Sequence, residues 1–243
     1  MCTVVVLRRP GAAWPLLLAA NRDERQDRAW DAPAAHWPDQ PGVIAGRDRL
    51  AGGTWMAMNR QGVTCAILNR VGTLGPAADK RSRGELPLLA ARHPSAAAAA
   101  KTLAALPAGD WRGFNMVLAD ARDAWFIRGT GAGRPQLVPL PPGVSMVTAH
   151  DPNDLTSPRT ARHLPRFQAA PPPEPDRDDW AGWAALLGDD SLAESRADTL
   201  CVPPVGGFAT VSASLVGLAA DGRRTWRFAP GPPNRTAFAP LPL

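Results

Sequence analysis

The sequence has no apolar run near the length needed to cross a bilayer, about 18 residues or more. Cysteine is also scarce: Cys2, Cys65 and Cys201 are odd in number, far apart and without CxxC spacing. Neither a disulfide framework nor a zinc site is indicated by such a set. We therefore expect a cytoplasmic protein with no membrane span, no metal and no cofactor.

Tyrosine is absent, and only two of the basic residues are lysines. The 27 Lys and Arg residues exceed the 22 Asp and Glu residues and give a net charge of +5, but arginine is spread along the chain and interleaved with acidic residues. There is no basic arm, so nucleic-acid binding is not expected. A local cluster, KRSR at 80–83, could meet an anionic group such as a phosphate.

Arg8-Arg9 followed by AAWPLLLAA resembles a twin-arginine export signal. The arginines, however, follow strand-like VVVL, the apolar stretch is short, and Pro10-Gly11 favours a turn. We interpret this segment as a hairpin between two strands at 3–7 and 15–20, whose continuous apolar runs are typical of strands buried on both faces.

The rest of the chain alternates between strand and helix patterns. An irregular Pro-rich segment is expected to about Gly42, followed by a hairpin of GGTWMAMN and VTCAILN around residues 60–62. The two following segments are typical of helices, the second capped by Ser95, with its poly-alanine expected on the surface. The predicted helices are 83–93 and 95–106.

Four strands are then predicted in a meander, at 114–120, 124–130, 136–140 and 144–149. Ser157-Pro158 predicts the start of a helix that runs toward Phe167, and another helix is expected at 178–188. Two closing strands, 208–218 and 224–229, should be joined at Asp221-Gly222. This order predicts one α+β domain over residues 1–243, with antiparallel sheets covered by helices.

The chemistry-bearing residues lie at the first hairpin. Asn21-Arg22-Asp23-Glu24 follows the second strand, and in a hairpin the start of the first strand lies opposite the end of the second. Cys2 and this NRDE segment should therefore be neighbours. A thiolate nucleophile needs cationic or hydrogen-bonding groups around it, which the segment supplies. The alternative is a solvated charged turn beside an ordinary strand cysteine.

Five segments, in order, resemble the NRDE family, also called the transport and Golgi organisation protein 2 family: MCTVVVL, LLLAANRDE, GGTWMAMNRQGVTCAILN, RGELPLLA and GFNMVLAD. They cover most of residues 1–120. Members of this family are similar to N-terminal-nucleophile hydrolases, whose fold is a four-layer αββα sandwich. The most similar branch contains penicillin V acylase, bile-salt hydrolase and acyl-CoA:isopenicillin N acyltransferase.

This resemblance implies a cysteine amidohydrolase or acyltransferase that acts on a small-molecule, non-peptide amide or thioester. Removal of Met1 would leave Cys2 at the N-terminus, with its thiol as nucleophile and its own α-amine as base. An acyl-enzyme would form at Cys2 and pass to water or another acceptor. Asn69 and Asn115 occupy positions where this branch places groups that bind the oxyanion or orient the amine.

Two departures from the pattern are visible. The acylase branch has an arginine and an aspartate three residues apart after its second strand, whereas this chain offers either Asn21 with Glu24 or Arg22 with Asp23. Both alignments stay open. Near the C-terminus, family members commonly have a Gly-Thr-Arg run, but the run at 206–210 is Gly-Gly-Phe-Ala-Thr, without the arginine.

The alternative function is that of a non-catalytic carrier of haem, acyl-CoA or lipid on the same fold, because eukaryotic relatives are linked to such processes. The remaining residues have structural interpretations. Cys65 and Cys201 are expected in the core. Gly52-Gly53 should allow a tight strand entry, with Trp55 in the core. No metal site is expected, because His36, His93, His150 and His163 are unclustered.

Overall fold

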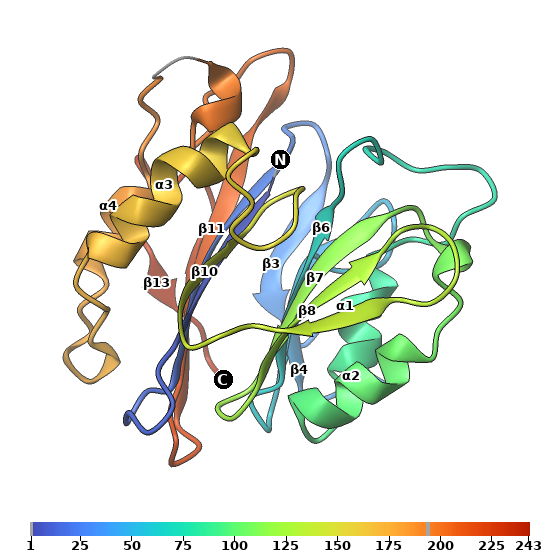
Figure 1. Ribbon diagram of the computed structural model, residues 1–243, viewed down its shortest axis with the longest axis horizontal. Helices are drawn as coiled ribbons and strands as arrows, with labels where there is room; N and C mark the ends of the chain where they lie inside the picture. Colours follow the sequence, from blue (N-terminus) through green and yellow to red (C-terminus); the bar gives the residue numbers. More distant parts are fainter. Residues whose placement is uncertain (1, 193–194) are drawn as a thin grey trace. The chain divides into compact units, whose positions relative to one another are not determined.

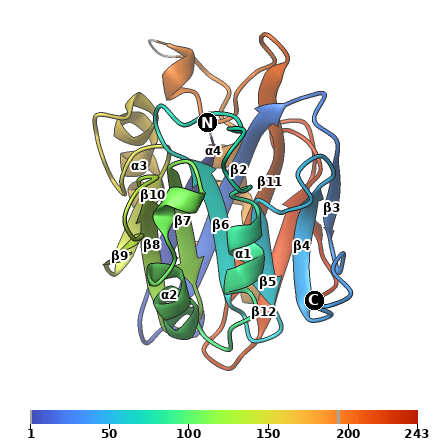
Figure 2. The ribbon, with the colours of Figure 1, turned by 90° about the vertical axis from the view of Figure 1, so that its right-hand side faces the viewer.

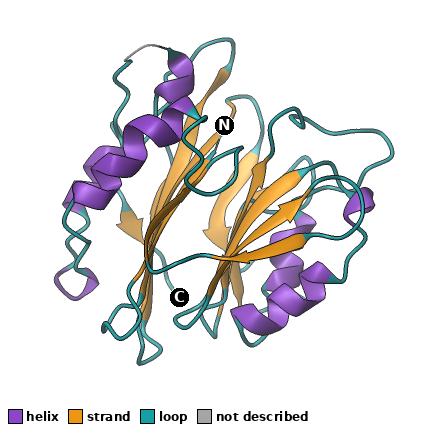
Figure 3. Ribbon diagram, viewed as in Figure 1, coloured by secondary structure: helices purple, strands orange, loops and turns teal. Residues whose placement is uncertain are grey.

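The computed structural model describes residues 2–192 and 195–243. The chain forms two compact units. Unit 1 contains the N-terminal segment to Asp27 together with Pro141–Leu243, and unit 2 is Arg28–Leu140. Each unit contains one antiparallel sheet with helices on one of its faces. Figure 3 distinguishes the helices from the strands by colour.

The sheet of unit 1 has six strands in the order β10-β1-β2-β11-β12-β13. Its central strand β2 is flanked by β1 and by the longest strand, β11. The strands are β1 (Thr3–Arg8), β2 (Leu16–Arg25), β10 (Gly143–Val147), β11 (Phe208–Leu218), β12 (Arg224–Ala229) and β13 (Ala239–Pro240).

Helices α3 (Pro158–Ala169) and α4 (Ala181–Leu187) lie along one face of this sheet (Figure 1). Alternate residues of β1 and β2, such as Val5 and Leu17, pack against Phe167 and Trp183 from the helices. Successive strand residues point to opposite faces, so one set of alternate positions in β1 and β2 faces the helices and the other set faces away. Short 3-10 turns occur at η2 (Pro175–Arg177) and η3 (Arg196–Asp198).

The seven strands of unit 2 pair in chain order, from β3 to β9. Helices α1 (Glu85–Ala90) and α2 (Ala96–Ala104) lie over β5 to β8 (Figure 2), and the 3-10 turn η1 spans Ala108–Asp110. The strands are β3 (Trp30–Ala34), β4 (Val43–Asp48), β5 (Met56–Asn59), β6 (Thr64–Asn69), β7 (Phe114–Ala119), β8 (Ala124–Gly129) and β9 (Gln136–Pro139).

The predicted hairpins are confirmed: β1 with β2, β5 with β6, and β11 with β12. The predicted helix caps are confirmed as well, because Ser95 accepts from the Ala98 amide at 3.2 Å and Ser157 from the Thr160 amide at 3.3 Å. Local turn and cap chemistry was sufficient for these features. Among the described residues, no helix has both the length and the apolar character that a bilayer crossing requires.

Three predictions about the fold are wrong. The segment expected to be irregular contains β3, which pairs with β4 despite its proline. The expected four-strand meander has three members, because β10 pairs with β1 in the sheet of unit 1. The poly-alanine of α2 is not merely surface: Ala96, Ala99 and Ala100 are buried, because the small side chains let the helix lie close to the sheet.

The strand entry at Gly52-Gly53 is tight, as expected. Gly52 has φ +72°, and a Cβ on Gly53 would lie 2.6 Å from the backbone carbonyl carbon of Gly84. Trp55 is only half-buried and packs edge to face on Trp30 at a ring-centroid distance of 5.7 Å. The expectation of a core tryptophan is therefore met only in part.

Candidate active site

Cys2 directly precedes β1 and lies beside the NRDE segment. Thr3 pairs with Asn21 in the antiparallel ladder, and the Cys2 thiol donates to the backbone carbonyl of Asp23, with Sγ 3.6 Å from the oxygen. Cys2 is half-buried. The predicted proximity of Cys2 and the NRDE segment is therefore present in unit 1.

The NRDE segment is itself strand, because β2 continues through it to Arg25. Asn21, Arg22 and Asp23 are 1%, 6% and 5% exposed. The alternative interpretation of this segment as a solvated turn is wrong. Partners on both sides explain the extension: β1 pairs with β2 as far as Asn21, and β11 pairs with it as far as Arg25.

Because strand residues alternate, the four NRDE side chains divide between the two faces of the sheet. Asn21 and Asp23 point to the face covered by α3 and α4, on which Thr3 also lies. Cys2 precedes Thr3 and so lies on the opposite face, together with Arg22 and Glu24. Neither alignment considered from the sequence places both of its side chains beside the Cys2 thiol.

Asn21 supports the segments that cover the helix face. Its Nδ2 donates to the carbonyls of Leu187 at 2.9 Å and Leu200 at 3.1 Å, at the end of α4 and beyond η3. Two carbonyls 166 and 179 residues away are thus held by one amide. Asn21 therefore links these two segments to β2, and its part in catalysis stays a prediction.

Asp23 is held at both carboxylate oxygens. Arg159 donates from Nη1 to Oδ2 at 2.9 Å, and Thr210 donates from Oγ1 to Oδ1 at 2.6 Å. The same Nη1 of Arg159 also donates to Thr3 Oγ1 at 3.1 Å. The side chains of Asp23 and Arg159 are 0% and 3% exposed, so this is a buried ion pair.

Arg22 and Glu24 are the charged NRDE side chains on the face of Cys2. Arg22 Nη2 lies 3.9 Å from Glu24 Oε2, and Glu24 is the more exposed partner, at 29% against 6%. In the ladder, Arg22 pairs with Ser212 of β11, next to a register shift between Thr210 and Ser212. A cation is thus placed on the same face of the sheet as the thiol.

The electrostatic surroundings act on Cys2 in both directions. Burial raises the pKa of the Cys2 thiol, the Asp23 carboxylate raises it further, and Arg22 opposes the shift. The net pKa is raised above the ordinary value, so the thiol is protonated near neutral pH. A nucleophile at this position needs a base to take that proton.

Sequence reasoning missed Arg159, Thr210 and Thr3. Arg159 is 136 residues from Asp23, and nothing in the local pattern connects them. Thr210 had a signal, because it belongs to the run in which the family arginine is missing. That run contributes the Thr210 hydroxyl to Asp23.

Asn69 and Asn115 belong to unit 2 and lie on opposite faces of its sheet. Asn69 pairs with Phe114, whose side chain is in the core beneath the helices, whereas Asn115 pairs with Leu68. Asn115 is fully buried and accepts at Oδ1 from Arg70 at 2.7 Å, so Nδ2 is its donating end. Their oxyanion role stays a prediction.

The other two thiols are buried, as expected. Burial raises the pKa of Cys65 well above its ordinary range and that of Cys201 to about 11. Within residues 2–192 and 195–243, no group of three or more His, Cys, Asp or Glu side chains could hold a metal ion.

The KRSR cluster is bonded to protein groups. Arg81 forms an ion pair with Glu85 at 2.8 Å, and Arg83 donates to the carbonyls of Thr73 and Gly113 at 2.8 and 3.0 Å. Lys80 donates to the carbonyl of Gly109 at 2.6 Å. These cations hold the loop between β6 and α1.

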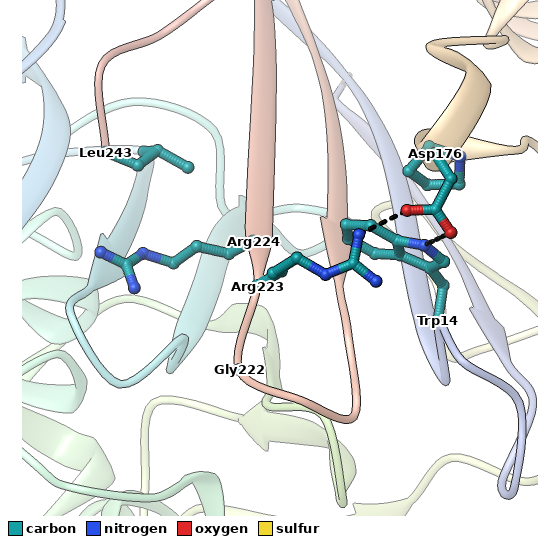
Figure 4. A pocket seen from close by; sticks show the side chains of 7 residues that line it. Trp14, Asp176, Gly222, Arg223, Arg224 and Leu243 are labelled. Atoms are coloured by element: carbon teal, nitrogen blue, oxygen red, sulfur yellow. Dashed lines mark hydrogen bonds and ion pairs between the residues drawn. The ribbon is translucent and has the colours of Figure 1, made fainter.

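A cavity of about 440 Å³ in unit 1 is shown in Figure 4, and Cys2 is not among its lining residues. Arg223 lies over the Trp14 ring at 5.1 Å, and Asp176 accepts from both residues, at 2.9 Å from Trp14 Nε1 and 2.5 Å from Arg223 Nη1. This arrangement ties η2 to the β1–β2 and β11–β12 turns. The lining residues are Trp14, Pro175, Asp176, Gly222, Arg223, Arg224 and Leu243.

Two solved structures are similar over nearly their whole lengths. A Caenorhabditis elegans ortholog of N-acylethanolamine-hydrolyzing acid amidase has a TM-score of 0.60 at 11% identity, over 99% of this chain and 100% of that chain. A C2A mutant of conjugated bile acid hydrolase from Clostridium perfringens has a TM-score of 0.53 at 11% identity, over 100% of this chain and 97% of that chain.

These likenesses confirm the predicted fold class, an α+β fold of the N-terminal-nucleophile hydrolase type. No curated protein matches the sequence. The model of one family, Transport and Golgi organisation 2, matches residues 1–168, which is well beyond the segments that first suggested it. The chain therefore belongs to the Transport and Golgi organisation 2 family.

Proposed function

We propose that this protein is a cysteine N-terminal-nucleophile hydrolase or acyltransferase acting on a small-molecule amide or thioester. The observation that carries the proposal is the position of the Cys2 thiol. It precedes the first strand and contacts the Asp23 carbonyl, and the alternation of strand side chains, continued by one residue, places it on the face of Arg22. The fold of amide hydrolases supports the same reaction class.

The proposed base is the α-amine of Cys2. While Met1 is attached, the nitrogen of Cys2 is an amide without basicity, and the thiol has a raised pKa. Removal of Met1 creates an amine with a reference pKa of about 7.7 to 8.0, which suits proton transfer near neutral pH. A small second residue such as cysteine favours that removal.

The reaction is written in two steps. The α-amine accepts the thiol proton as Sγ attacks the substrate carbonyl carbon, and the bond from that carbon to the leaving nitrogen or sulfur breaks as the α-ammonium returns the proton. The resulting thioester at Cys2 is cleaved by water, which gives a carboxylic acid and restores the thiol. Transfer to another acceptor would replace water in the second step.

The test compares wild type with Cys2→Ala against a panel of acyl amides and acyl-CoA thioesters. Alanine at position 2 also permits removal of Met1, so the two chains differ only at the nucleophile. Cys201→Ala, which removes a buried thiol of the same unit, is the control. We expect Cys2→Ala to lower turnover by more than about 10³-fold, and Cys201→Ala to retain it.

Equal turnover by wild type and Cys2→Ala would overturn the mechanism. The enzymatic function would be contradicted, and the carrier function favoured, if wild type shows no turnover and if it binds haem or acyl-CoA as well as Cys2→Ala does.

A further inference from the structure

Arg159 occupies an unfavourable position for its charge. It lies in the first turn of α3, directly after Pro158, where the helix dipole disfavours a cation. It is also only 3% exposed, and burial of a guanidinium is costly. Helix stability and solvation therefore both oppose an arginine here, so its contacts must explain its presence.

Those contacts join the two strands that meet at Cys2. From α3, Nη1 reaches Thr3 Oγ1 on β1 and Asp23 Oδ2 on β2, at 3.1 and 2.9 Å. Thr3 is the residue that follows Cys2, and the carbonyl of Asp23 accepts the Cys2 thiol. One guanidinium thus holds the residue that follows the nucleophile and the residue whose carbonyl accepts its thiol.

Stability alone does not account for such a pair, because buried ion pairs can often be replaced by apolar side chains without loss of stability. The location of this ion pair, next to the start of the chain, does account for it. Residues next to a chain terminus are poorly ordered unless they are tied down. Thr3 and Asp23 are tied to the same side chain, and Thr210 holds the second carboxylate oxygen of Asp23 at 2.6 Å.

We propose that Arg159 is a positioning residue for Cys2: it fixes Thr3, which follows Cys2, and Asp23, whose carbonyl accepts the thiol, and it compensates the charge of the Asp23 carboxylate. This inference rests on the proposed function of Cys2 as the nucleophile. It assigns Arg159 no contact with substrate, and the proposed action passes through Thr3 and Asp23.

The charge of Arg159 should shift the pKa of the Cys2 thiol in a direction that can be measured. The Asp23 carboxylate raises the pKa of the Cys2 thiol, and a cation bonded to that carboxylate weakens its field. Loss of the cation in Arg159→Met should make the thiol harder to ionise. Loss of the carboxylate in Asp23→Asn should make it easier, and the double variant should lie between the two.

The experiment measures the pH profile of Cys2 alkylation by iodoacetamide in the full-length chain, by mass spectrometry of the N-terminal peptide. We expect Arg159→Met to move the midpoint upward by about one pH unit and to slow labelling at pH 7.5 by about tenfold. Arg159→Lys keeps the charge and should recover part of the wild-type rate. Asp23→Asn should move the midpoint downward.

Arg162→Met is the matched control. Arg162 lies one turn further along α3 and binds the largely buried Asp198 at 2.9 Å, without contact to Thr3 or Asp23. This variant should lower thermal stability and leave the Cys2 profile unchanged. If Arg159→Met lowers stability in the same way and leaves the Cys2 profile at its wild-type position, the proposal is overturned and Arg159 is a structural residue only.

Alkylation requires no substrate, so this test can be separated from that of the proposed function. A wild type without turnover, in which labelling still depends on Arg159, would contradict catalysis and retain the positioning role. Turnover that needs Cys2, together with labelling that does not depend on Arg159, would support catalysis by Cys2 and overturn the positioning role of Arg159. If Arg159→Met does not fold, the comparison of Arg159→Lys with wild type decides, with an upward midpoint shift expected from weaker bonding to Asp23.

Discussion

Units 1 and 2 have similar architectures but bury different chemistry. Each contains an antiparallel sheet with two helices on one face. Among the described residues, unit 1 buries Arg22, Asp23, Arg159 and Asp198, whereas the one buried charged side chain of unit 2 is Asp120. Asp120 accepts from backbone amides, including that of Ala96 at 2.8 Å.

The difference lies in how the buried polar groups are satisfied. In unit 2, Asn59 donates to the carbonyls of Ala91 and His93 and accepts from the amides of Gln61 and Val63, so one neutral side chain fastens its own turn to the segment after α1. In unit 1, Arg159 and Asp23 bind each other across 136 residues, and the carbonyl of Asp23 contacts Cys2. Burial of charge is costly, so its concentration in one unit indicates positioning rather than stability.

The largest effect should come from cutting the buried pair of unit 1. Arg159→Met leaves Asp23 without its buried cation and should lower the free energy of unfolding by about 3 to 5 kcal/mol. The control in unit 2 is Arg92→Met, because Arg92 and Asp39 are paired at 3.0 Å but are 56% and 63% exposed. It should change stability by less than about 1 kcal/mol. Urea unfolding measures both, and equal losses would contradict the comparison.

The second largest effect should be a dependence of the free energy of unfolding on pH, which arises in unit 1. His163 is fully buried, its Nε2 donates to the Asp198 carbonyl at 2.8 Å, and Arg166 donates to its Nδ1 at 3.1 Å. Burial lowers the pKa of His163 to about 4, and the Arg166 and Arg162 charges act in the same direction. The folded state therefore holds the neutral ring.

Because the unfolded chain binds this proton near pH 6.5, the stability from neutral His163 is complete above that pH and is lost as the pH falls toward 4. The loss should reach about 3 kcal/mol at pH 4, with about 2 kcal/mol lost at pH 5. Thermal unfolding at pH 7.5 and 5 measures it. His163→Gln should show a smaller difference between the two pH values than wild type.

The third effect tests the packing of unit 2. Ala99 lies on the buried face of α2, and Ala97 is exposed on the same helix. Ala99→Leu should overpack the core and lower stability by about 1 to 3 kcal/mol, whereas Ala97→Leu should have little effect, since leucine and alanine are both good helix formers. Chemical denaturation of the two variants checks this. Equal stabilities would mean that α2 does not pack closely on its sheet.

Local chemistry made much of the fold predictable. Gly62 and Gly222 have φ of +82° and +90°, as their hairpin turns require, and Ser95 and Ser157 cap their helices. The pairing of β10 with β1 was not predictable, because strand spacing does not say to which sheet a strand belongs. The burial of α2 was missed because alanine is compatible with both surface and core.

The candidate site also has some features that the sequence predicts and others that it does not. The proximity of Cys2 to the NRDE segment followed from antiparallel pairing alone. The faces of Asn21 and Asp23 depended on whether β2 continues through the segment, which pairing with β11 decides. The contact of Arg159 with Asp23 joins positions 136 residues apart and has no local signal.

The proposed function requires Cys2 to react as the N-terminal residue. The most direct test is to quench the enzyme during turnover of a thioester substrate and to identify the acylated peptide by mass spectrometry. We expect an acyl group on Cys2 in a peptide that lacks Met1. An acyl group on Cys201, or an acylated peptide that still carries Met1, would contradict it.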